Sequence, residues 1–127
     1  METKFNFNSQ ICTSIIQSER LLALGLKKET ADMYYSPFYF EDSLLDYFDA
    51  KVLGDSVGEE IMAGYEEYKD YIPAWSLHRL IKLNLLSCEQ HFAFQFHITN
   101  IDNACDYLVD HIEWLIKEGH FPKEYLV

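Results

Sequence analysis

The chain has 127 residues, 49% of them hydrophobic and 16% aromatic, with 21 acidic and 10 basic side chains and a formal net charge of −11. The apolar content excludes a disordered chain, and the length suits one domain spanning residues 1–127. The acidic excess argues against direct binding of nucleic acid or of an anionic membrane surface.

The cysteines are few, odd in number and widely spaced: Cys12, Cys88 and Cys105. We therefore expect reduced thiols and a cytoplasmic protein. The first ten residues, METKFNFNSQ, contain no apolar run, so we expect no signal peptide. No apolar run elsewhere is long enough to predict a membrane span.

A helix is predicted over residues 14–24. Ser14 and Gln17 have the spacing of a capping box, and Gly25 suits a left-handed C-terminal cap. Residues 4–12 alternate at two phenylalanines and predict a short strand or arm. Residues 33–40, MYYSPFYF, are predicted to be extended, with Pro37 marking an edge strand or a break in two.

The acidic middle of the chain is predicted to be helical. Ser43 suits a cap for a helix that carries Leu44, Leu45, Phe48 and Val52 and ends at Gly54. Ser56 and Glu59 have capping-box spacing, before a stripe of Ile61, Tyr65, Tyr68 and Ile72. Pro73 is predicted to open the next helix, with Leu77, Leu80 and Ile81 on one face.

Residues 90–99 alternate with period two, which predicts a strand that buries Phe92, Phe94, Phe96 and Ile98. The last helix is predicted over residues 103–118, ending at Gly119. Its core stripe comprises Cys105, Leu108, Val109, Ile112, Leu115 and Ile116, and the opposite face carries Asp106, Asp110, Glu113 and Lys117. The expected fold is α+β, with about five helices on a small, mostly antiparallel sheet.

Two stretches, ICTSIIQSERLLALGLKKETADMYY at 11–35 and IPAWSLHRLIKL at 72–83, carry a resemblance. They resemble a family of short uncharacterised proteins of gut bacteria, their prophages and mobile elements. Trp114 and Leu115 match a weaker terminal-helix pattern of that family, whereas residues 41–70 depart from it. The resemblance implies a mobile-element context and no particular chemistry.

Catalytic and metal motifs find little support. Cys88, His91, His97 and Cys105 are the candidate zinc ligands, but they include only one closely spaced pair, whereas structural zinc sites usually have two. A Cys–His nucleophile lacks a local signature. The carboxylate pairs Glu59/Glu60, Glu66/Glu67 and Asp106/Asp110 are predicted to lie on solvated helix faces. We therefore expect no catalytic residue, metal or cofactor.

Two features are candidates for partner binding. Residues 41–70 carry a net charge of −8, which suits a surface that steers a basic partner or one that merely keeps the protein soluble. On the last helix, the ring side chains of Tyr107, His111 and Trp114 are spaced by four and three residues, which places them on one face. Such a row suits either an aromatic anchor for a partner or the margin of the core. The candidate residues are Glu59, Glu60, Glu66, Glu67, Asp70, Tyr107, His111 and Trp114.

The sequence thus predicts a non-catalytic domain that binds a protein. A basic protein or a nucleic-acid-binding protein is the kind of partner that the acidity suits. Two alternatives stay open at this stage: an acidic inhibitor that mimics nucleic acid on a host defence protein, and a small-ligand-binding protein or small enzyme. Self-association is also left open.

Overall fold

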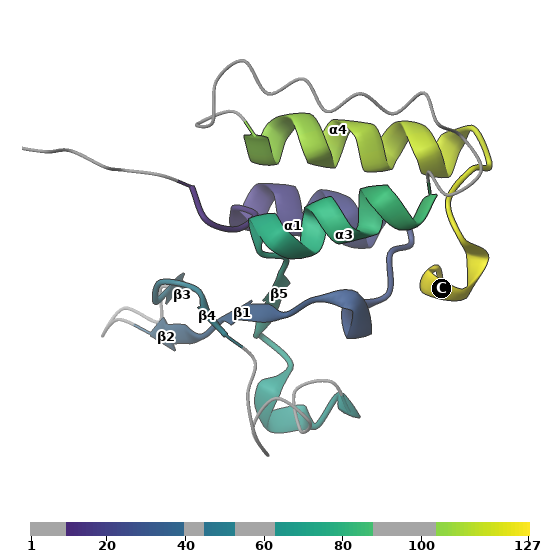
Figure 1. Cartoon of the computed structure of the whole chain (residues 1–127). Coiled ribbons are helices and arrows are strands. Elements are labelled where there is room, and N and C mark those ends of the chain that lie inside the picture. Colours follow the sequence, from purple (N-terminus) through teal and green to yellow (C-terminus); the bar gives the residue numbers. More distant parts are fainter. Residues whose placement is uncertain (1–9, 40–44, 53–62, 88–103) are drawn as a thin grey trace, which may run out of the picture.

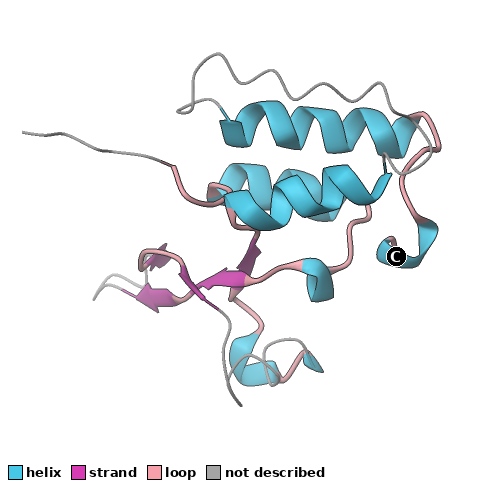
Figure 2. Cartoon of the chain, in the orientation of Figure 1, coloured by secondary structure: helices cyan, strands magenta, loops and turns pink. Residues whose placement is uncertain are grey.

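The computed structural model describes residues 10–39, 45–52, 63–87 and 104–127. Within these ranges the fold is α+β, with three α-helices and two small antiparallel sheets. The helices lie together on one side and the strands gather on the other (Figures 1 and 2). None of the helices in this part of the chain combines the length and apolarity needed to cross a bilayer.

Helix α1 (Ile15–Ala23) begins as its sequence predicts. The Ser14 side chain accepts a hydrogen bond from the Gln17 amide, and the Gln17 side chain accepts one from the Ser14 amide. The helix ends before Gly25, whose φ of 97° is a left-handed value that other residues rarely adopt. Leu26 then donates its amide to the Leu21 carbonyl, and both side chains enter the core. The predicted capping box and glycine cap are therefore confirmed.

The aromatic segment forms two strands, β1 (Met33–Tyr35) and β2 (Pro37–Tyr39), so the chain breaks next to Pro37 as expected. β1 lies between β4 (Lys51–Val52) and β5 (Ile72–Ala74), antiparallel to both. β2 pairs with β3 (Leu45–Tyr47) in a separate antiparallel sheet. The 3₁₀ turns η1 (Lys28–Thr30), η2 (Glu66–Tyr68) and η4 (Lys123–Tyr125) connect or end these elements.

The main core lies between α1, α3 (Leu77–Ser87) and α4 (Ala104–Lys117). Helix α4 confirms the predicted stripe, because Ile116 is partly buried and the other five members are buried. Leu80 is fully buried, while Leu77 and Ile81 pack against the same core. This packing places one face of α4 in the core, whereas Asp110 and Trp114 lie outside it.

The helix predicted after Ser43 is wrong within the described residues, because residues 45–47 and 51–52 are strands. The supposed core stripe is exposed at Leu45, Phe48 and Val52. Strand pairing with β1 and β2 supplies the backbone hydrogen bonds that a helix would otherwise have made. Tertiary pairing has therefore overridden the apparent helical spacing of the apolar residues.

The helix predicted after Ser56 lies mostly outside the described residues: Ala63 is helical, but the predicted continuation through Tyr65, Tyr68 and Ile72 is wrong. Gly64 has a φ of 78°, after which the chain forms only the short turn η2 and then enters β5 at Ile72. Pro73 lies inside β5, which is tolerated because β5 is at the edge of its sheet. Helix α3 starts four residues later, where the Ser76 hydroxyl accepts a hydrogen bond from the Arg79 amide at 3.0 Å.

The described residues contain three α-helices, whereas about five were expected for the chain; in the described part of the acidic middle, β3, β4 and η2 occupy positions predicted to be helical. Some predictions lie outside the described residues: most of the arm at 4–12, the Ser56–Glu59 capping box and the strand at 90–99.

Candidate partner-binding surfaces

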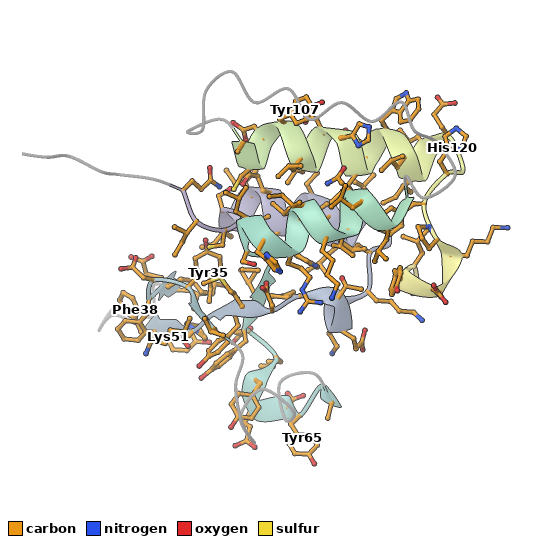
Figure 3. All side chains as sticks on the ribbon, viewed as in Figure 1. Tyr35, Phe38, Lys51, Tyr65, Tyr107 and His120 are labelled. Carbon is orange, nitrogen blue, oxygen red and sulfur yellow. The ribbon has the colours of Figure 1, made fainter. Side chains whose placement is uncertain are left out.

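Five large exposed apolar side chains lie on the end of β2, on β3 and β4 with the turn between them, and before η2; these segments, described residues 39, 45–52 and 63–70, are here called the acidic lobe. Exposed large apolar side chains are candidates for contact with a partner. Those exposed on the acidic lobe are Tyr39, Leu45, Phe48, Val52 and Tyr65. Figure 3 shows that Lys51 and Tyr65 of this lobe lie on the side away from the helices.

Aromatic contacts hold the acidic lobe in shape. The Phe38 and Phe48 rings lie 4.6 Å apart between centroids, which fastens the segment after β3 to β2. Tyr71 stacks on Tyr34 at 5.9 Å and meets the edge of Tyr68 at 5.0 Å. Such pairs contribute about 0.5–1.5 kcal/mol each beyond the burial of their area. These contacts attach the described lobe residues Phe48 and Tyr68 to rings outside the lobe, Phe38 and Tyr71.

The described part of the acidic lobe carries five acidic and two basic side chains, a net charge of −3. Glu66 and Glu67 are exposed as predicted, although on a 3₁₀ turn, and Glu66 lies 3.3 Å from Lys69. Asp70 accepts a hydrogen bond from the Tyr39 hydroxyl, which raises the pKa of that tyrosine. Glu59 and Glu60 lie outside the described residues.

The second candidate surface is the aromatic row along α4. Tyr107 stacks on His111 at a centroid distance of 6.4 Å, and His111 stacks on Trp114 at 5.7 Å. The row continues to His120, 5.5 Å from Trp114, a member that sequence spacing missed. The sequence feature that points to His120 is Gly119, whose φ of 75° turns the chain at the end of α4. Trp114 is 51% exposed, so the row is more than a core margin.

The row is anchored from beneath by α3. His111 Nδ1 lies 2.7 Å from the buried Asn84 Oδ1, and the side-chain Nδ2 of Asn84 donates a hydrogen bond to the Leu80 carbonyl at 2.7 Å. Burial lowers the pKa of His111, so the neutral ring is favoured. The imidazole is consequently held in the orientation in which it stacks on Tyr107 and Trp114.

The two surfaces do not form one site. Tyr107 and His120 lie along the outer side of α4, whereas Phe38, Lys51 and Tyr65 lie beyond the strands on the opposite side (Figure 3). A partner that covers one surface therefore leaves the other uncovered, unless it wraps around the molecule.

The cysteines in the described residues are poor nucleophiles. Cys12 and Cys105 are buried and free, and burial raises the pKa of both thiols, that of Cys105 to about 11. Cys88, His91 and His97 lie outside the described residues, so the absence of a metal stays a prediction. In the described ranges, no three potential ligand side chains come together in a cluster.

The acidic face of α4 has partners on α1. Arg20 pairs with Asp110 at 2.8 Å and with Glu113, which lowers the pKa of Glu113. Gln17 donates a hydrogen bond to Asp106. These carboxylates help dock the two helices and do not converge as an acid–base pair.

The segments that carry the family resemblance meet in a polar network beneath the helices. The buried Trp75 donates its indole N–H to the Thr30 hydroxyl at 2.9 Å and its amide to the Thr13 hydroxyl at 3.1 Å. Asp32 accepts hydrogen bonds from the Ser76 amide at 2.8 Å and from the Ser76 hydroxyl at 2.5 Å. Each bond joins segments far apart in sequence, so these motifs are explained by folding and not by a site.

Comparison with known protein families finds no matching family model, and comparisons with curated proteins and with solved structures find no significant match.

Proposed function

We propose that this chain is a non-catalytic domain that binds another protein through the acidic lobe. The observation that supports this most directly is that the described residues of the acidic lobe combine five exposed, large apolar side chains with an excess of carboxylates. Apolar anchors within a charged rim are the usual composition of a protein interface.

The same combination defines the partner's chemistry. A complementary surface would present apolar side chains flanked by lysine or arginine, because opposite potentials accelerate encounter and fix the register. A nucleic-acid mimic would need a run of carboxylates at phosphate spacing. Phe48 and Val52 interrupt the charges of the lobe, which favours an ordinary protein partner.

A cytoplasmic location and a mobile-element origin belong to this proposal. They are supported by the composition of the chain and by the resemblance of residues 11–35 and 72–83.

The test begins with recovery of the partner from cells that express the chain naturally, by affinity capture and mass spectrometry. Association of the purified pair is then followed by stopped flow at low salt. The variant Asp49→Lys/Glu67→Lys reverses two exposed charges of the lobe. We expect its association rate to fall about tenfold or more.

The matched control, Glu118→Lys/Glu124→Lys, makes the same charge change at exposed positions outside the lobe. Its rate should stay within about twofold of wild type once long-range charge is screened. Equal slowing in both variants would assign the acidity to net charge alone. Unchanged rates in both folded variants would move the binding site to the Tyr107–His111–Trp114 row.

A further inference from the structure

We propose that a cavity between η1, α3 and η4 binds a small organic anion with one negative charge and an apolar body. The cavity has a volume of about 650 Å³, within the range of small-molecule sites. It is lined by three cations, Lys27, Arg79 and Lys82. None of the residues that line it belongs to the acidic lobe, so this site is independent of the proposed protein-binding function.

The walls of the cavity are fixed by backbone hydrogen bonds. Lys27 donates its amide to the Tyr125 carbonyl at 2.9 Å, and Val127 donates its amide to the Gly25 carbonyl at 2.7 Å. An isolated bridge joins Leu26 and Leu126. The C-terminal turn is thereby tied to the loop after α1. This attachment keeps the cavity largely formed before a ligand enters.

Two of the three cations at this cavity, Lys27 and Lys82, form no ion pair in the described residues. Lys28, Lys51 and Lys123 are unpaired there as well, but they do not line the cavity. In a chain with twice as many acids as bases, unpaired cations on one cavity create a local site for an anion.

Arg79 adds a directional donor. Its buried Nε lies 3.9 Å from Asp32 Oδ2 and has no hydrogen-bond partner, while both oxygens of Asp32 already accept hydrogen bonds from Ser76. Asp32 therefore positions the guanidinium but leaves the Nε donor of Arg79 without an acceptor. The partly exposed guanidinium retains donors suited to a carboxylate or phosphate oxygen.

The remaining lining determines the class of anion. Leu83 is buried, and Leu86 and Tyr125 are partly buried, which gives one wall an apolar character. Glu29 and Glu124 also line the cavity, and Asp32 pairs with Arg79, so the cations are in no large excess over the carboxylates. That near balance limits the ligand to a single negative charge and disfavours a polyanion such as a nucleotide triphosphate.

The probes are 3-phenylpropionate, its cationic analogue 3-phenylpropylamine, and inorganic phosphate, each titrated into the full chain by NMR. We expect saturable binding of 3-phenylpropionate, with shifts at the amides of η1, α3 and η4, and at least about tenfold weaker binding of the other two. Equal binding of the amine would overturn the anion requirement. Equal binding of phosphate would overturn the apolar requirement.

The variant Lys82→Gln changes an exposed side chain, so the fold should be retained. It should weaken binding of 3-phenylpropionate about tenfold. The matched control Lys51→Gln removes the same charge from β4, and its affinity should stay within about twofold of wild type. Equal weakening by both variants, or no saturable binding by wild type up to about 10 mM, would overturn the proposal.

Discussion

Replacing Thr30 by valine tests whether the family-like segments act by holding the fold together. Valine has nearly the shape of threonine but lacks the hydroxyl, which accepts the Trp75 indole N–H and donates to the Lys27 carbonyl at 2.7 Å. Trp75 is fully buried, so water cannot replace the lost acceptor without rearrangement. A buried unsatisfied donor costs about 1–3 kcal/mol, and the second bond contributes about 0.5–1.5 kcal/mol.

We therefore expect Thr30→Val to lower the free energy of unfolding by about 2–4 kcal/mol. Thr30→Ser is the matched control: it keeps the hydroxyl and removes one largely buried methyl group, at a cost of about 1 kcal/mol. Urea unfolding at 25 °C, followed by circular dichroism, measures both, because indole fluorescence would itself respond to the substitution. If Thr30→Val proves no less stable than Thr30→Ser, the network does not hold these segments together.

Three further predictions concern the core, the aromatic row and the thiols. Leu108→Ala, at a fully buried position, should cost about 2–5 kcal/mol in urea unfolding, whereas exposed Leu85→Ala should cost under about 0.5 kcal/mol; similar costs would contradict the assigned core. The folded-state pKa of His111 is lowered, so its contribution to stability is complete above about pH 6.5 and is lost as the pH falls. His111→Gln should therefore flatten the wild-type dependence of the free energy of unfolding on pH between acidic and neutral conditions. An unchanged slope of unfolding free energy against pH would contradict this prediction. In a Cys88→Ser background, the remaining two thiols should react with a disulfide reagent far more slowly in the native state than in urea, and fast native reaction would contradict their burial.

Helices α1 and α4 are predictable from the sequence because the patterns that indicate them are local. The Ser14–Gln17 capping box and the 3.6-residue stripe of α4 depend only on neighbours along the chain. The same reasoning fails in the described residues 45–52 and 64–74, where backbone pairing of β1 with β4 and β5 decides the structure. Pro73 illustrates the failure, since its preference for a helix start is equally compatible with an edge strand.

The candidate surfaces are predictable to different degrees. The Tyr107–His111–Trp114 spacing gives the row on α4 directly, but His120 joins it only through the turn at Gly119. The exposure of Phe48 is not predictable, because helical spacing makes it a core residue. The cavity of Lys27, Arg79 and Lys82 combines segments about fifty residues apart, and no spacing rule connects them.

Site-specific photo-crosslinking in cells that express the chain naturally tests the central claim most directly. A photoreactive phenylalanine analogue replaces Phe48 on the acidic lobe or, in a parallel variant, Trp114 on the aromatic row; both native rings are about half exposed. If the acidic lobe binds the partner, position 48 should give a discrete adduct with one protein, and Asp49→Lys/Glu67→Lys should abolish that adduct. An adduct from position 114 alone, or none from position 48, would contradict the account.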